Sequence, residues 1–212
     1  LLESCLEHWK KLSSKRKELF RLHHISTDEV YGSLEEKGLF SEKSQYDPRS
    51  PYAASKAASD HFVKAWHTTY GLPVIKTNCC NNYGPWQFPE KLIPLVILKA
   101  LKNEEIPLYG DGANIRDWLF IDDHINGILL AAIKGRIGET YCIGANQEKN
   151  NKEVVKSICH LIDEFKPTNL PRERLIKHVK DRSGHDRRYA IDSSKLREEL
   201  NWAPTYDFNT GL

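Results

Sequence analysis

The stretch Leu19-Phe20-Arg21-Leu22-His23-His24-Ile25, followed by Ser26-Thr27-Asp28-Glu29, decides the fold class of this 212-residue chain. Its apolar residues predict a buried strand over 19–26, after which Thr27, Asp28 and Glu29 stand at the carboxyl edge. Open α/β sheets bind their ligands at that edge. The sequence therefore predicts a ligand site directly after this strand, although Asp28 and Glu29 could also be solvated loop acids.

A second stretch, Ser50-Pro51-Tyr52-Ala53-Ala54-Ser55-Lys56, predicts a helix start. Ser50 can cap free amide hydrogens, and Pro51 has the backbone angle of a first turn. Tyr52 and Lys56 are four residues apart and so share one helix face. The ammonium group could then lower the phenol pKa from about 10 towards the range of a general base. The same spacing also occurs between ordinary surface residues.

Asp28 and Glu29 are neighbours in the sequence, yet their surroundings can differ. One carboxyl could stay protonated and act as an acid, while the other is ionised and acts as a base. Together with Tyr52, they form a set of proton-transfer groups.

Helix and strand patterns alternate along the rest of the chain, which predicts α/β architecture. Helices are expected at 1–18, 51–70, 90–101, 122–133 (capped by Asp122), 152–165 and 193–200, and strands at 19–26, 72–78, 106–109 and 139–144, the last being the final sheet strand. We expect a loop at 81–85 and a hairpin or tight turn at 110–112. The buried face of helix 152–165 is predicted to hold Val154, Val155, Ile158, Leu161, Ile162 and Phe165.

Composition excludes several partners. The 31 basic and 29 acidic residues nearly balance, so we expect neither nucleic acid nor membrane as a partner. Five scattered cysteines without a Cys-x-x-Cys spacing predict free thiols and no metal site. No run of 18 apolar residues and no signal-peptide pattern occurs, which predicts a soluble, cytoplasmic protein.

Six motifs in this order resemble the dTDP-glucose 4,6-dehydratase family, a group of NAD-dependent extended short-chain dehydrogenases/reductases. The motifs are Ser26–Gly32, Ser50–Lys56, Asn81–Pro85, Phe88–Pro94, Ile115–Trp118 and Asp181–Asp186. Related sugar-nucleotide epimerases have no acid pair at the position of Asp28 and Glu29. In GDP-mannose dehydratases and UDP-glucuronate decarboxylases, the residues at this position are similar to Thr-Ser-Glu. The resemblance therefore favours a dehydratase acting on dTDP-glucose.

The resemblance implies the C-terminal portion of a Rossmann-like, doubly wound parallel sheet plus a small α/β substrate-binding lobe. Residues 1–84 would be the remaining half of the NAD-binding domain. Residues 85–212 would be mostly the lobe, with segments near 115–145 returning to the sheet. The family's Gly-x-x-Gly-x-x-Gly turn is absent, and the chain contains no methionine. We therefore expect a fragment that lacks about a hundred N-terminal residues and is inactive alone.

The resemblance also implies a mechanism with NAD as cofactor. Tyr52 would take the proton of the sugar C4 hydroxyl, assisted by Lys56, while hydride passes to NAD. Glu29 would remove the C5 proton, and Asp28 would protonate the departing C6 hydroxyl. Thr27 would position the sugar. The product would be dTDP-4-keto-6-deoxyglucose.

Binding residues are implied position by position. Those for the cofactor are Tyr52, Lys56 and Asn82. Those for the substrate are Thr27, Asn81, Lys91, Leu92, Pro107, Leu108, Tyr109, Arg116, Asn151, Asp181, Arg182, Ser183, Gly184 and His185. The family commonly has proline at the position of Ser183. Taken singly, some of these have structural interpretations, such as an Arg116–Asp117 ion pair or a turn at Asn81 and Asn82.

Two alternatives stay open. The chain could belong to another nucleotide-sugar dehydratase, decarboxylase or epimerase of the superfamily, or it could be a non-catalytic fragment. Family members form homodimers through a four-helix bundle, and helices 1–18 and 51–70 match those positions. The apolar face Ala54, Ala58, Phe62, Ala65 and Trp66 could be this interface or equally part of the core.

Overall fold

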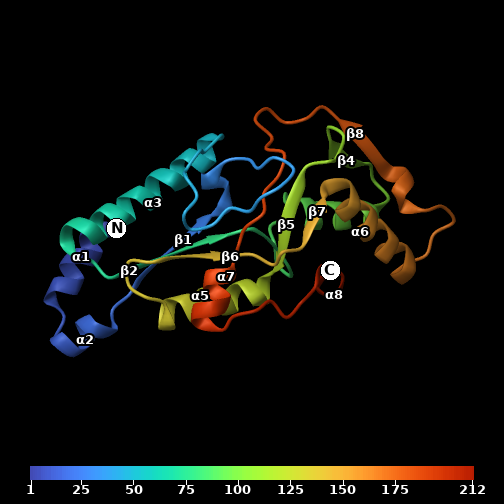
Figure 1. The fold of residues 1–212 in the computed structure, drawn as a ribbon. Coiled ribbons are helices and arrows are strands. Elements are labelled where there is room, and N and C mark those ends of the chain that lie inside the picture. Colours follow the sequence, from blue (N-terminus) through green and yellow to red (C-terminus); the bar gives the residue numbers. More distant parts are fainter.

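The computed structural model describes residues 1–212 and is built around a three-stranded parallel sheet. The strands β1 (Leu22–Thr27), β2 (Val74–Cys79) and β6 (Thr140–Ile143) lie in the order β1-β2-β6. Helix α3 (Pro51–Tyr70) covers one face, and α5 (Ile121–Lys134) and α7 (Ser194–Leu200) cover the other (Figure 1). The α/β prediction is confirmed.

The register of β1 and β2 sets the position of the site. Leu22 faces Val74 at one end of the pair, and Thr27 faces Cys79 at the other. Because the strands are parallel and in register, the residues after Thr27 and after Cys79 leave the sheet at the same edge. Polar residues from two distant segments therefore meet there.

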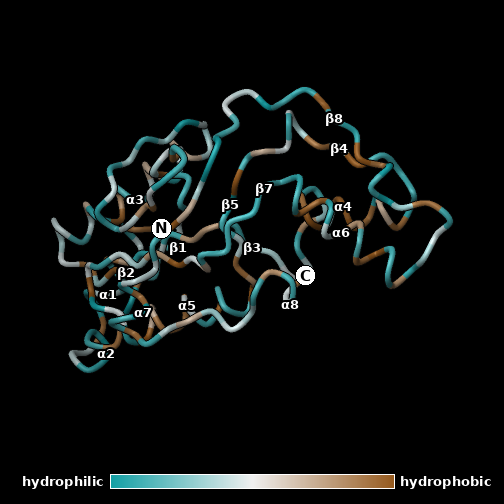
Figure 2. The backbone as a smooth tube through the Cα atoms, turned by 45° about the vertical axis from the view of Figure 1, so that its right-hand side comes forward, coloured by the Kyte–Doolittle hydropathy of each residue, from teal (hydrophilic) through white to brown (hydrophobic).

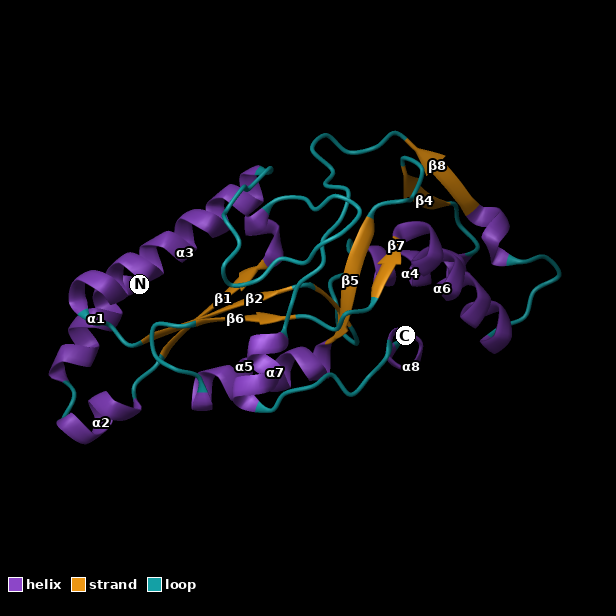
Figure 3. Ribbon diagram, viewed as in Figure 1, coloured by secondary structure: helices purple, strands orange, loops and turns teal.

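A second, smaller unit is drawn on the right of Figure 3. Strands β3 (Asn81–Tyr83), β5 (Ile115–Phe120) and β7 (Glu148–Asn150) form one sheet, and β4 (Ile106–Tyr109) pairs in parallel with β8 (Ile176–Val179). Helices α4 (Leu92–Lys102) and α6 (Asn151–Phe165) share its apolar core. The boundary at residues 84 and 85 stays a prediction.

Helix α3 begins and ends as its sequence predicts. The Ser50 hydroxyl accepts a hydrogen bond from the Ala53 amide at 3.0 Å, and Pro51 is the first helical residue. Gly71 ends the helix with φ +70°, a conformation that a residue with a side chain rarely adopts. Tyr52 is thereby fixed in the first turn.

The N-terminal region differs from its prediction. The expected helix 1–18 is two helices, α1 (Leu2–Lys11) and α2 (Ser14–Leu19), separated at Leu12 and Ser13. Serine competes with helix formation by favouring cap positions, which accounts for the break. The strand starts at Leu22 rather than at residue 19, because Leu19 belongs to α2 and is exposed.

Three further expectations about element positions are wrong. Asp122 does not cap α5, which begins one residue earlier with no side-chain cap. The segment 81–85 contains β3 and so is not only a loop, and β6 is not the final strand, since β7 and β8 follow. At 110–112, where a hairpin or a tight turn was expected, the tight turn is confirmed, because β4 pairs with β8.

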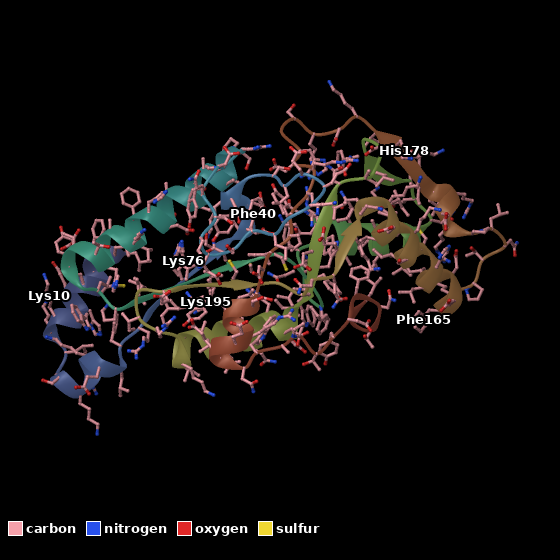
Figure 4. The ribbon with its side chains drawn as sticks, viewed as in Figure 1. Lys10, Phe40, Lys76, Phe165, His178 and Lys195 are labelled. Carbon is pink, nitrogen blue, oxygen red and sulfur yellow. The ribbon has the colours of Figure 1, made fainter.

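The predicted buried face of α6 is largely right but fails at its last member. Val154, Val155, Ile158 and Ile162 are buried, whereas Phe165 is 87 % exposed at the end of the helix (Figure 4). The helix has no next turn to cover it. Short helical elements complete the fold at Asp28–Tyr31 (η1), Arg172–Leu175 (η2) and Phe208–Gly211 (α8). None of the helices is long and apolar enough to cross a membrane.

Candidate active site

Thr27, Asp28 and Glu29 are held at the carboxyl end of β1 by a short hydrogen-bond chain. Thr27 precedes η1, and its hydroxyl accepts from the Glu29 amide and donates to Asp28 Oδ1, both at 3.3 Å. The Thr27 carbonyl accepts from Asn78 Nδ2 on β2 at 2.9 Å. The triplet is therefore tied to both β1 and β2.

Asp28 is buried, with 2 % of its surface exposed, and its Oδ2 has no hydrogen-bond partner. Burial raises its pKa to about 8, and the nearby carboxyls of Glu29 and Asp117 add to the shift. The group is therefore mostly protonated at pH 7. A protonated carboxyl with a free oxygen at the edge of a sheet can act as a general acid.

Glu29 has different surroundings from Asp28. Burial raises its pKa too, but the positive charges of Arg116, Arg182 and Lys91 oppose that rise. Glu29 is also partly accessible, whereas Asp28 is not. The adjacent acids thus differ in environment: three cations oppose the rise of the pKa at Glu29, whereas the carboxyls of Glu29 and Asp117 add to the rise at Asp28.

Tyr52 and Lys56 do not interact as the sequence predicts. Lys56 Nζ donates to the Ile25 carbonyl of β1 at 2.9 Å. Burial raises the Tyr52 pKa, and the nearby acidic groups of Glu29, Cys79 and Asp28 add to this. The expected lowering of the phenol pKa is therefore wrong for this structure. The reason is that β1 pairs only with β2, so its carbonyls can attract the ammonium group.

Asn82 presents a buried polar atom without a partner. Its Nδ2 contacts Cys79 Sγ at 3.5 Å, and its Oδ1 makes no hydrogen bond. Gln87 donates from Nε2 to the Asn82 carbonyl at 2.9 Å, and its own Oε1 is likewise buried and unpaired. Asn81 and Asn82 lie in β3 and not in a turn. Gln87 was missed by the sequence analysis because it lies between two motifs.

Arg116 is buried in β5 and is held by backbone carbonyls. It donates to the Ile115 carbonyl at 2.7 Å and the Asp186 carbonyl at 2.9 Å, and its guanidinium lies 4.4 Å from the centre of the Tyr189 ring. It makes no ion pair with Asp117, whose carboxylate accepts from the Ala145 and Gln147 amides.

Two residues of this cluster carried no sequence signal. Tyr189 lies under the Arg116 guanidinium, and its hydroxyl donates to the Asp186 carboxylate. Asp186 ends the last motif but was not assigned a role. Only the contact with Arg116 draws attention to either residue.

The predicted substrate segment 181–185 belongs to the hydrophilic connection that leaves β8 and crosses from the smaller unit towards the larger one (Figure 2). The Arg182 guanidinium lies 5.6 Å from the Tyr109 ring centre. His185 Nδ1 lies 2.7 Å from Asp181 Oδ1, and its Nε2 is buried without a partner. Ser183 and Gly184 are exposed.

The remaining predicted residues divide by exposure. Lys91 is exposed beside Glu90, at 3.3 Å, directly before α4, whereas Leu92 and Pro107 are half-buried and Asn151 is the first residue of α6. Leu108 is part of the apolar core, so its side chain is not free to contact a ligand. The charges of Lys91, Arg116 and Arg182 nevertheless all act on Glu29, so segments far apart in sequence converge here.

Two cavities lie elsewhere, one of about 500 Å³ against α1 and α3 and one of about 690 Å³ beside Lys76 and Thr140. No predicted catalytic residue lines either cavity. The chain contains no group of three or more His, Cys, Asp or Glu placed to hold a metal ion.

Comparison with known proteins gives three kinds of match. A family model described as GDP-mannose 4,6 dehydratase matches residues 1–212. A protein from Xanthomonas campestris pv. campestris named dTDP-glucose 4,6-dehydratase is 58 % identical over 214 residues, covering 100 % of this chain and 61 % of the relative. The chain thus spans about 61 % of the length of that curated relative.

Solved structures are similar over almost the whole chain. The Bacillus anthracis dTDP-glucose 4,6-dehydratase in complex with NAD is 46 % identical with a TM-score of 0.86, covering 99 % of this chain and 63 % of the other. The Thermus thermophilus UDP-glucose 4-epimerase complex with NAD is 25 % identical with a TM-score of 0.85, covering 100 % and 64 %. Dehydratase and epimerase thus share this backbone.

Proposed function

Because the chain belongs to the GDP-mannose 4,6-dehydratase family, we propose that it carries the catalytic residues of a dTDP-glucose 4,6-dehydratase. The proposed reaction converts dTDP-glucose to dTDP-4-keto-6-deoxyglucose. Support comes from the 58 % identity to the Xanthomonas relative and from the Thr27-Asp28-Glu29 triplet. An epimerase is the alternative that shares the backbone, but it needs no acid at C6.

The observation that carries this proposal is Asp28. A carboxyl with a pKa raised to about 8, buried and with one oxygen unpaired, is suited to give a proton to a leaving hydroxyl at neutral pH. An enzyme that only inverts C4 has no leaving hydroxyl. The acid at this position therefore favours elimination of water.

The proton steps are assigned to this chain's own side chains. Tyr52 accepts the C4 hydroxyl proton as the C4 hydride departs, because the positive charge of bound NAD would lower the phenol pKa that burial raises in the chain alone. The resulting ketone acidifies the C5 hydrogen. Glu29 removes the C5 proton, and Asp28 protonates the C6 hydroxyl, which leaves as water. Once C6 has received the hydride, Glu29 returns a proton to C5. Thr27 positions the sugar through its hydroxyl.

The residues present fit the nicotinamide end of a dinucleotide. Tyr52 and Lys56 stand beside the free edge of β1, and Asn82 offers a buried, unpaired oxygen to a polar group. The glycine turn that would bind a pyrophosphate has no counterpart in these 212 residues. NAD, when bound, supplies a hydride acceptor that holds the C4 hydride until it is returned to C6.

For the nucleotide diphosphate, we assign the cationic groups near Glu29. Arg182 and Lys91 are exposed and can reach phosphate oxygens, while Arg116 supplies charge from a buried position. His185 and Asn81 add polar contacts. Residues 85–212 would then act mostly as the substrate lobe, and residues 1–84 as the catalytic half.

We also assign the outer face of α3 to a homodimer interface. Ala54, Ala58, Phe62 and Ala65 are exposed and Trp66 is half-buried, which argues against the core alternative. Phe62 is 58 % exposed. Phe62→Glu should convert a dimer to a monomer in analytical ultracentrifugation, whereas Lys64→Glu, on the same helix, should not. A dimer that survives Phe62→Glu would contradict the assignment.

The test is a chimera in which this chain replaces the matched region of the Xanthomonas campestris enzyme. We expect the chimera to turn over dTDP-glucose, detected by the absorbance of the 4-keto product in alkali, and UDP-glucose much more slowly. The 212-residue chain alone should be inactive, since Lys56 binds Ile25 there and nothing in the chain fits the pyrophosphate. Formation of a C4 epimer without water loss would contradict the proposal.

Glu29→Gln and Tyr52→Phe separate the two half-reactions in the chimera. Tyr52→Phe should abolish oxidation at C4. Glu29→Gln should permit that oxidation but block water loss. Equal loss at both steps in both variants would contradict the assigned roles.

A further inference from the structure

Asp60 is a buried acid that the proposed reaction does not use. It lies on α3 and is 1 % exposed. Tyr52, Lys56 and Asp60 follow one another at intervals of four residues, so they form one stripe along the helix. A buried carboxylate is costly unless it is fully hydrogen-bonded, and so its partners indicate what it holds.

The partners of Asp60 come from β1, from β2 and from one loop. His24 Nε2 on β1 donates to Oδ1 at 2.8 Å, and the Tyr46 hydroxyl donates to Oδ2 at 2.6 Å. From β2, Lys76 Nζ lies 3.4 Å from Oδ2, and Asn78 Nδ2 lies 3.4 Å from the same atom. Burial alone would raise the pKa of Asp60, but the His24 hydrogen bond and the Lys76 charge outweigh it and hold the pKa well below its usual range.

Two of these contacts lead directly to the catalytic residues. Asn78 Nδ2, which contacts Asp60, also donates to the Thr27 carbonyl at 2.9 Å. His24 is followed by Ile25, whose carbonyl accepts the Lys56 hydrogen bond one helical turn nearer to Tyr52. The stripe that ends in Tyr52 is thus attached to the strand that ends in Thr27. Figure 4 shows Lys76 between α3 and the sheet.

We propose that Asp60 is a positioning residue that fixes Tyr52 against Thr27, Asp28 and Glu29, by tying α3 to β1 and β2 through His24 and Asn78. This inference rests on the proposed function, because it assumes that Tyr52 reacts at C4. No other acid on α3 could replace it, since Asp60 is the only Asp or Glu between Pro51 and Tyr70. A shift of α3 of about 1 Å would cost catalysis on the order of 100-fold.

The test compares Asp60→Asn with Val63→Ala in the chimera. Asp60→Asn keeps the size of the side chain but removes its charge. Val63→Ala removes buried methyl groups from the same helix without touching the Asp60 contacts. Asp60→Asn should lower kcat about 10- to 100-fold with less than about a threefold change in the KM for dTDP-glucose. Its kinetic isotope effect with C4-deuterated substrate should increase, because the Tyr52 step becomes slower.

Val63→Ala should lower the thermal midpoint yet leave kcat and the isotope effect unchanged. If Asp60→Asn changes only the thermal midpoint, or lowers kcat no more than Val63→Ala, the positioning role is refuted. Tyr52→Phe separates the two proposals: an inactive Tyr52→Phe beside a fully active Asp60→Asn refutes this inference and leaves the proposed function standing.

A second measurement needs no catalysis. In the 212-residue chain, Asp60→Asn should accelerate amide hydrogen exchange at Ala53–Lys56 and Thr27–Val30 at least about tenfold more than Val63→Ala does. Equal exchange at these two segments in both variants would overturn the proposal, even if the chimera were inactive.

Discussion

Asp28→Asn tests the claim that burial keeps a protonated acid at the centre of the site. The folded chain has an Asp28 pKa of about 8, against 3.8 for an ordinary aspartate. A pKa raised on folding means that the native state binds the proton more tightly. The stabilisation that this tighter proton binding gives the folded chain is complete below about pH 4. It declines as the pH rises and is fully lost above about pH 8.

The magnitude follows from linkage. Between about pH 5 and pH 7 the unfolded carboxyl is ionised and the folded one is not, so one proton is released on unfolding. The wild-type chain should therefore lose about 1.4 kcal/mol of unfolding free energy per pH unit from this group. Asparagine has nearly the same shape and does not titrate, so the variant loses that slope.

Urea unfolding of the 212-residue chain and of Asp28→Asn at a series of pH values measures the difference directly. The stability of the variant minus that of wild type should rise by about 2 to 3 kcal/mol between about pH 5 and pH 7. Asp122→Asn, which alters an exposed acid on α5, should show no such trend. A difference for Asp28→Asn that does not depend on pH would refute the reasoning.

Two further predictions concern stability in the smaller unit. Asn150→Ala should lower the free energy of unfolding in urea by about 1 kcal/mol. The Asn150 side chain accepts a hydrogen bond from the Glu153 amide at 2.8 Å, and the Glu153 carboxylate accepts one from the Asn150 amide at 3.0 Å. An unchanged stability would mean that this capping box contributes nothing. Ile158→Ala should cost about 2 to 5 kcal/mol because Ile158 is fully buried, whereas Phe165→Ala should change stability by less than about 0.5 kcal/mol. Equal losses for these two would contradict the described packing of α6.

Local signals account for the parts of the fold that the sequence predicted well. Ser50, Pro51 and Gly71 define α3 through chain chemistry alone, and the apolar run 72–78 defines β2. The break at Leu12 and Ser13 follows from the preference of serine for cap positions, and Phe165 is exposed because α6 ends there. The apolar periodicity shows neither where a helix breaks nor where it ends.

The site shows the same division. The Thr27-Asp28-Glu29 triplet and Tyr52 lie in recognisable motifs, so the sequence alone located them. The pKa of Tyr52 depends on where Lys56 finds its acceptor, and that acceptor is a carbonyl on another element. Tyr189 contacts Arg116, which is far away in the sequence, and spacing along the chain does not reveal that contact. Gln87 bonds to Asn82, only five residues away, but it lies between two motifs.

The measurement that tests the central claim most directly is the mass of the chimera's product formed from dTDP-glucose in heavy water. If Glu29 removes the C5 proton and Asp28 expels the C6 hydroxyl, the product is a 4-keto-6-deoxy sugar that has lost one water and carries one solvent deuterium, at C5. A product of unchanged mass, such as a C4 epimer without deuterium, would contradict the account.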